Sequence, residues 1–333
     1  MRRNILILVT LVTLFSLLIT SCAPAAPQAT TKKIKLAVVL PGVITDADYN
    51  SLAFMALTSV KEEMGIETAY SESVPVPDVE RVMREYIDNG YNLIWTHGGQ
   101  FITQTQKLAG EFKDVTFIGE GDAPVKDMPE NMWMIDRNFH IGFYAIGVLA
   151  AKASKTGKIG YIAGQTLPFS YAEVHAMQQA IQDQNLKVDL KTVWSGDFND
   201  PTKGRQVADA MIADGIDVLV CSLNLGAMGV FEAVKAQPGK ALVTAKYIDK
   251  SKYAPDAYIT ALLYDFKGPL KEIITKIQNG EKGAYYPLGF QTGVALQMPL
   301  KNVSPEVSAD VAKIVDDIKS GKIEVKKDIS PIK

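Results

Sequence analysis

Residues 87–94 read Ile-Asp-Asn-Gly-Tyr-Asn-Leu-Ile, and residues 212–219 repeat the pattern as Ile-Ala-Asp-Gly-Ile-Asp-Val-Leu. In each stretch a helical segment ends at a glycine, turns through Asn or Asp and enters an apolar strand. Gly90 and Gly215 suit this turn because glycine readily adopts the left-handed conformation that ends a helix. Many helix-to-strand turns have this form, but the matching order in both halves of the chain favours two similar α/β lobes.

The segments around these turns alternate between short apolar runs and helical patterns. Val79, Val82, Met83, Tyr86 and Ile87 have the spacing of one apolar helix face. Nearly continuous apolar strands between amphipathic helices predict parallel sheets that helices cover on both faces. We expect strands at 35–40, 92–96, 115–119, 132–135, 158–163, 188–194, 218–222, 242–247 and 258–263.

The N-terminus has the pattern of a bacterial lipoprotein signal. Arginines at 2–3 precede an apolar run over 5–19, and small residues lead into Cys22. The run is short for a membrane helix, although an uncleaved anchor helix is the alternative. We expect a signal peptide over 1–21, lipid on Cys22, a flexible tether over 22–33 and a position outside the cytoplasmic membrane.

Composition limits the functions that the remaining residues can have. The chain has 333 residues, a formal net charge of -2 and no basic cluster, so we expect no nucleic-acid partner. Cys221 lies in an apolar run and predicts a buried thiol rather than a disulfide. His97, His140 and His175 show no metal-ligand spacing, so we expect neither a metal nor a cofactor.

Loops after the strands are the expected binding region, since two open α/β lobes bind ligands where the carboxyl ends of their strands meet. Tyr49 and Phe198 lie in such loops, one in each lobe. Two rings facing across a cleft would hold a planar ligand, with about 0.5–1.5 kcal/mol for each stacked face beyond area burial. The pattern predicts a nucleobase or nucleoside. The candidate ligand-binding residues are Asp46, Tyr49, Asn50, Gly98, Gly99, Asp122, Asp136, Arg137, Phe169, Phe198, Asp200, Asn224, Lys246 and Asp249.

Some of these residues also have an ordinary structural interpretation. Asp46 and Asp200 precede predicted helices, which they can cap. Asp136 and Arg137 can form a salt bridge with each other or contact a ligand. The segment 119–122 lacks the third glycine of a dinucleotide fingerprint, and no nucleophile elbow or phosphate loop is present, which argues against an enzyme.

Five motifs in a fixed order carry a resemblance to a known family. They are Asp46-Ala47-Asp48-Tyr49-Asn50, Gly142 to Ala151, Gly157-Lys158-Ile159-Gly160, Phe198-Asn199-Asp200-Pro201 and Tyr253-Ala254-Pro255-Asp256. From the lipobox to about Pro299 the chain resembles the basic membrane protein (Bmp) family, which contains purine-nucleoside-receptor-like ABC transporter substrate-binding lipoproteins. The resemblance implies an α/β type I periplasmic-binding fold, with two Rossmann-like lobes joined by three hinge crossovers. It also implies that Tyr49 and Phe198 flank the base, with Asp46 and Asn50 hydrogen-bonded to the base or its sugar.

The chain departs from the family's nucleoside binders at 222–224 and 245–249, where those proteins carry segments that typically hold ribose hydroxyls. It looks closer to the purine-base-binding branch, with adenine as the candidate ligand; riboflavin is also bound within the family. We expect one lobe from 34–138 plus 250–280 and the other from 139–249 plus 281–333. We expect a lipid-anchored monomer that passes its ligand to an ABC permease. A sensor of the same fold or a nucleoside-processing enzyme is the alternative.

Overall fold

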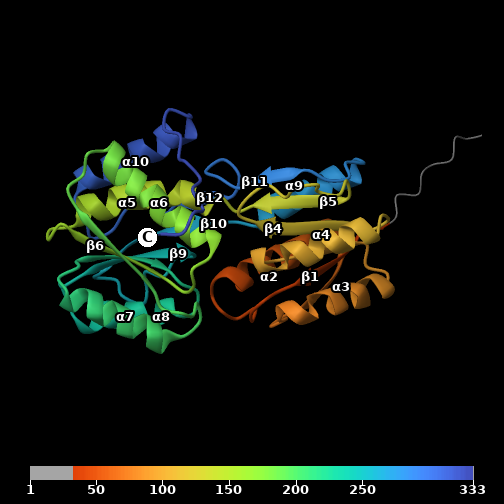
Figure 1. The fold of residues 1–333 in the computed structure, drawn as a ribbon, viewed down its shortest axis with the longest axis horizontal. Helices are drawn as coiled ribbons and strands as arrows, with labels where there is room; N and C mark the ends of the chain where they lie inside the picture. The colour runs from red at the N-terminus through yellow and green to blue at the C-terminus, as the bar shows by residue number, and fades with distance from the viewer. Residues whose placement is uncertain (1–32, 333) are drawn as a thin grey trace, which may run out of the picture. The chain divides into compact units, whose positions relative to one another are not determined.

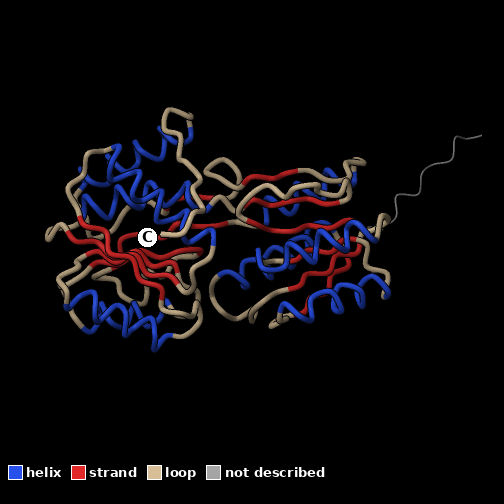
Figure 2. The backbone as a smooth tube through the Cα atoms, viewed as in Figure 1, coloured by secondary structure: helices blue, strands red, loops and turns tan. Residues whose placement is uncertain are grey.

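Two six-stranded sheets, each covered by helices on both faces, make up the computed structural model (Figure 1). The structure describes residues 33–332, so the expected signal peptide, the lipid site at Cys22 and the tether up to residue 32 lie outside the described residues. Both sheets belong to one unit, residues 34–333. Figure 2 shows the strands as layers between the helices.

The first sheet is parallel throughout and has the order β11-β5-β4-β3-β1-β2. Side chains alternate across it, since Leu36 and Val38 belong to one core cluster while Ala37 and Val39 belong to another. Its strands are β1 Lys35–Val39, β2 Glu67–Ser71, β3 Leu93–Thr96, β4 Thr116–Gly121, β5 Met132–Asp136 and β11 Tyr285–Pro287. Its helices are α2 Tyr49–Met64, α3 Val79–Asp88, α4 Ile102–Glu111 and α9 Lys267–Gln278, with short 3-10 helices η1 Val76–Asp78 and η2 Gly99–Phe101.

The second sheet has the matching order β12-β10-β9-β8-β6-β7, with an antiparallel edge strand, β12. The equivalent order confirms that the chain builds two similar lobes. The strands are β6 Lys158–Ala163, β7 Asp189–Trp194, β8 Val218–Ser222, β9 Leu242–Tyr247, β10 Tyr258–Tyr264 and β12 Val294–Leu296. The helices are α5 Phe139–Ala153, α6 Pro168–Asp183, α7 Pro201–Ala213, α8 Ala227–Ala236 and α10 Pro305–Lys319.

The two quoted turns have equivalent geometry. Gly90 and Gly215 have φ of 84° and 83°, in the left-handed region that ends each helix. The backbone amides of Asn92 and Asp217 then donate to the carbonyl oxygens of the first residues of β1 and β6, Lys35 and Lys158, both at 3.2 Å. The repeated sequence therefore fixes the same strand entry in both lobes.

Three crossovers join the lobes, from β5 to α5, from β10 to α9 and from β11 to β12. This is the expected type I periplasmic-binding architecture. The expected lobe boundaries differ from the structure in two places. Strand β10 lies in the second sheet although 250–280 was expected in the first lobe, and β11 lies in the first sheet although 281–333 was expected in the second. Apolar patterning predicts that β10 is a strand, but it does not tell which sheet the strand joins.

We expect Gly229→Ala to lower the free energy of unfolding by about 1–3 kcal/mol, because overpacking forces backbone movement. A Cβ at Gly229 would lie 1.8 Å from the carbonyl oxygen of Pro201, where α8 crosses α7. Gly110→Ala in α4 is the matched control, since its Cβ meets nothing within 4 Å. It is expected to add up to about 1 kcal/mol of helix stability. Urea unfolding measures both, and equal stabilities of the two variants would contradict this packing.

Candidate functional site

A cavity of about 760 Å³ lies between the lobes, where the carboxyl ends of both sheets meet. Loops after the strands of each lobe supply its walls, as the arrangement of parallel strands predicts. The first lobe contributes Tyr49, Asn50, Gly99, Gln100, Asp122 and Arg137 among others. The second contributes Gln165, Phe169, Phe198, Asn199, Asn224 and Tyr247 among others.

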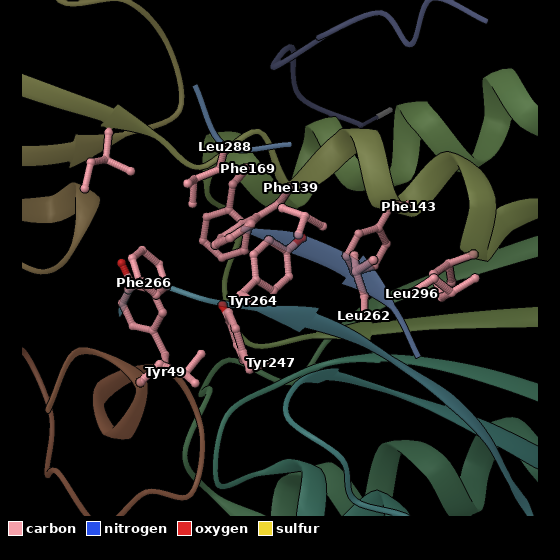
Figure 3. Close-up of a cluster of buried hydrophobic side chains, with 14 of the residues drawn as sticks. Tyr49, Phe139, Phe143, Phe169, Tyr247, Leu262, Tyr264, Phe266, Leu288 and Leu296 are labelled. Atoms are coloured by element: carbon pink, nitrogen blue, oxygen red, sulfur yellow. The ribbon is translucent and has the colours of Figure 1, made fainter. Parts of the chain in front are cut away.

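Neighbouring aromatic rings connect the first lobe to the second, and Figure 3 shows Tyr49, Tyr247, Phe139 and Phe169 among them. Of these four, Phe139 lies outside the cavity lining. Tyr49 lies 5.5 Å from Tyr247, and Tyr247 lies 5.9 Å from Phe139 between ring centroids. Phe139 in turn lies 5.5 Å from Phe169, which stacks on Phe198 at 5.8 Å. The cavity therefore offers flat apolar faces from both lobes.

Each of the two rings expected to flank a ligand already has a partner within its own lobe. Tyr49 stacks on His97 with a centroid distance of 3.8 Å, and Phe198 stacks on Phe169. Tyr49 is 6% exposed, so most of its surface is covered in this structure.

Carboxamides provide most of the polar lining. They belong to Asn50, Gln100, Gln165, Asn199 and Asn224. The Asn50 amide is engaged, since its oxygen accepts from the Gly42 amide at 3.1 Å and its nitrogen donates to Asp46 at 2.7 Å. Among the described residues, the charged side chains in the lining are Asp122 and Arg137, which pair at 2.5 Å. The lining is therefore close to electrically neutral.

A buried carboxylate lies behind this lining. Glu120 accepts from the hydroxyl of Tyr49 at 2.5 Å and from the indole nitrogen of Trp95 at 2.9 Å. It also contacts the Nδ1 atom of His97 at 2.6 Å. Burial acts to raise the pKa of the Glu120 carboxyl, but His97, Arg137 and the Tyr49 hydroxyl together outweigh it and lower that pKa. The carboxyl is therefore ionised in the protein interior.

A second buried ion pair crosses from lobe to lobe. Asp48, next to Tyr49, accepts from Lys250 Nζ at 2.7 Å, and both side chains are at most 1% exposed. The other carboxylate oxygen of Asp48 is buried without a hydrogen-bond partner. This pair ties the start of α2 to the loop after β9.

The structure brings eight of the fourteen candidate residues to the cavity wall. They are Tyr49, Asn50, Gly99, Asp122, Arg137, Phe169, Phe198 and Asn224. Gly98 lies directly behind this wall, with φ of 146°.

The remaining candidates have partners within the protein. Asp46 accepts from the amides of Asn50 and Ser51 in the first turn of α2, and Asp200 caps α7. Asp249 accepts from the side chain of Gln297 and the amide of Ser251. Lys246 pairs with Glu173 at 2.6 Å.

Asp136 and Arg137 do not pair with each other, which corrects one of the two expected arrangements. Arg137 pairs with Asp122, whereas Asp136 pairs with Lys327 at 2.5 Å and accepts from Tyr285. Successive side chains of an extended segment point to opposite sides, which separates the two charges.

Sequence reasoning missed several residues of the lining. Gln100 and Tyr247 lie within segments that the sequence had already singled out, so a closer look at those loops would have found them. Ile329 lines the cavity from the C-terminal segment, and it follows no strand that could have indicated its position.

Within residues 33–332, no cluster of His, Cys, Asp or Glu side chains has the arrangement of a metal site. In the same range, no helix has the length and apolar character to cross a membrane. Cys221 is buried as a free thiol, as expected.

Comparison with known proteins decides the family. The model of the Bmp family, described as ABC transporter substrate-binding protein PnrA-like, matches residues 33–328. The chain belongs to this family. It is 28% identical over 319 residues to basic membrane protein B of Borreliella burgdorferi, with 91% of this chain and 92% of that protein covered. It is also 26% identical over 296 residues to a purine-binding protein of Brucella abortus, with 88% and 83% covered.

Solved structures support the same fold. An ABC transporter solute-binding protein of Aeropyrum pernix has a TM-score of 0.77 at 20% identity, covering 89% of this chain and 94% of that one. One from Conexibacter woesei has a TM-score of 0.72 at 21% identity, covering 88% and 99%. As a Bmp-family member, the chain is an ABC transporter substrate-binding protein, which implies a small-molecule ligand and a permease partner.

We expect Asp48→Asn to make stability less dependent on pH. Burial raises the pKa of the Asp48 carboxyl to about 7, although Lys250 acts to lower it. The stability that this raised pKa contributes is fully present below the unfolded value of about 4. It is lost as pH rises through about 7. Urea unfolding at several pH values between these limits measures the slope. Asp256→Asn, at an exposed position, is the control; equal slopes for both variants would contradict the shift.

Proposed function

We propose that this protein is a lipid-anchored receptor that closes on a neutral purine, an adenine-like base or nucleoside, and delivers it to an ABC permease. The observation that carries the proposal is a cavity lined by aromatic rings and carboxamides whose charged residues, Asp122 and Arg137, pair with each other. Hinge closure around the ligand would shield it from water.

The two kinds of lining suit the two kinds of purine surface. Aromatic rings such as Phe169 and Phe198 match the faces of a flat heterocycle. Side-chain amides offer both donors and acceptors, which suits the alternating groups on a purine edge. A ligand without such groups would leave buried polar atoms unmatched, at about 1–3 kcal/mol for each.

The paired charges argue against an ionic ligand. A phosphate, carboxylate or ammonium group would enter a lining whose Arg137 and Asp122 already satisfy each other. A buried charge without a partner is costly. The purine-binding relative in Brucella abortus supports the same ligand class, at 26% identity.

The size of the cavity keeps a larger ligand as the second candidate. Its volume of about 760 Å³ falls in the upper part of the range for small-molecule sites, roughly 300–1,000 Å³. Riboflavin also presents a flat ring, and a receptor or sensor for it would use the same walls.

A nucleoside-processing enzyme is the less favoured alternative. Incubation of the protein with nucleosides tests it, since product formation would identify turnover.

We expect Phe198→Ala to weaken adenine binding at least tenfold, because the ligand loses an aromatic face, without unfolding the protein. Isothermal titration calorimetry measures the affinity, with circular dichroism as the folding check. Tyr171→Ala is the matched control, since Tyr171 packs against Trp194 in the same lobe but outside the cavity lining. Unchanged affinity of Phe198→Ala would remove this ring from the site.

We expect Cys22→Ser to release the protein from membranes, because the acyl chains would have no attachment point. Fractionation of cells expressing the full chain, followed by immunoblotting, measures the distribution. A variant that stays in the membrane fraction would instead indicate an uncleaved N-terminal helix.

A further inference from the structure

His97 has two ring nitrogens that both face acceptors. Nδ1 lies 2.6 Å from a carboxylate oxygen of Glu120, and Nε2 lies 2.9 Å from the backbone carbonyl oxygen of Tyr49. The ring is fully buried. A neutral imidazole has one N–H, so it can donate to one of these atoms and not to both. Both contacts are hydrogen bonds when the ring is an imidazolium.

The pKa of the Glu120 carboxyl is lowered, so this carboxyl is an acceptor and not the source of the missing proton. Trp95 donates to the carboxylate oxygen that His97 contacts, and the Tyr49 hydroxyl lies 2.5 Å from the other oxygen. Arg137 donates to that hydroxyl oxygen at 3.4 Å, which leaves the hydroxyl proton for Glu120. The cluster therefore pairs His97 with Glu120 and Arg137 with Asp122, and its charges sum to zero.

Tyr49 is held by this cluster at both ends and on one face. Glu120 binds its hydroxyl, His97 Nε2 binds its backbone carbonyl, and the imidazole stacks on its ring at 3.8 Å and 24°. Tyr49 lines the cavity, whereas His97 and Glu120 do not. We propose that His97 and Glu120 are positioning residues that hold Tyr49 in the cavity wall, and that His97 does so as an imidazolium.

The neighbours of His97 on every packed element are compatible with a cation. Strand β4 supplies Glu120 and helix α2 supplies Tyr49, whose phenolic pKa is raised by burial, so that the phenol stays neutral. Trp95 on β3, the strand that ends just before His97, and Phe266 beside α9 present their rings edge to face, at centroid distances of 5.2 and 5.0 Å. The other nearby charges, Arg137 and Asp48, are paired with Asp122 and Lys250.

Loss of the His97 proton would release Tyr49. The remaining N–H satisfies either Glu120 or the Tyr49 carbonyl, and the other contact becomes acceptor against acceptor. The cavity wall then loosens, so ligand affinity is lower when His97 is a neutral imidazole. This consequence for affinity rests on the proposed purine ligand; the protonation state and the placement of Tyr49 do not.

Histidine NMR on the ligand-free protein tests the charge directly. The chain has three histidines, so His97→Gln assigns the His97 signal among them. We expect the nitrogen shifts of His97 at pH 7.5 to be those of an imidazolium. His140 is an internal reference for the neutral form, since burial, with a smaller effect of Lys327, lowers its pKa to about 4. Neutral-imidazole shifts for His97 would overturn the proposal.

Two further measurements test the positioning role. Carbon signals of the Tyr49 ring, assigned with Tyr49→Phe, are expected to shift in His97→Gln relative to the wild type, because the stacked imidazole and its contact with the Tyr49 carbonyl are lost. An unmoved ring would overturn the role even if adenine does not bind. With adenine as the probe, calorimetry is expected to show at least fivefold weaker binding by Glu120→Gln at pH 7. Wild-type affinity in Glu120→Gln would contradict the proposal.

Discussion

The region between the lobes depends on one constraint: each charge that is buried there must be neutralised by a charge of opposite sign. Five acid–base pairs lie there or beside the crossovers, and in each the carboxylate side chain is at most 14% exposed. They are Asp48–Lys250, Glu120–His97, Asp122–Arg137, Glu173–Lys246 and Asp136–Lys327. Removing one partner from such a pair leaves a costly uncompensated charge. The wall built on these pairs is neutral, which favours a neutral ligand.

The fold places these pairs between the lobes and at the crossovers that join them. Three crossovers allow one lobe to rotate against the other, as in hinge-closing binding proteins. Asp48–Lys250 spans the lobes beside Tyr49, and Lys327 reaches Asp136 at the first crossover from the C-terminal segment. That segment also brings Ile329 to the cavity wall. Residues of the cavity lining and residues beside the crossovers thus share the same few segments of the chain.

Sequence pattern predicted the strands that are buried on both faces. The ranges 158–163, 218–222 and 242–247 match β6, β8 and β9 residue for residue. The pattern missed β2, a half-exposed edge strand, and it missed β11 and β12, which have only three residues each. The loops containing Tyr49, Arg137 and Phe198 were predicted because parallel topology fixes where strands end. The partners of Asp136 and Lys246 could not be predicted, because they lie 191 and 73 residues away along the chain.

We propose above that the cavity binds a neutral flat heterocycle. Native mass spectrometry of the protein purified without added ligand tests it most directly, since a closed receptor retains its cargo. The account predicts a bound mass that matches a purine base or nucleoside and that excess adenine displaces. A sugar, a peptide or an anionic ligand in its place would contradict the account.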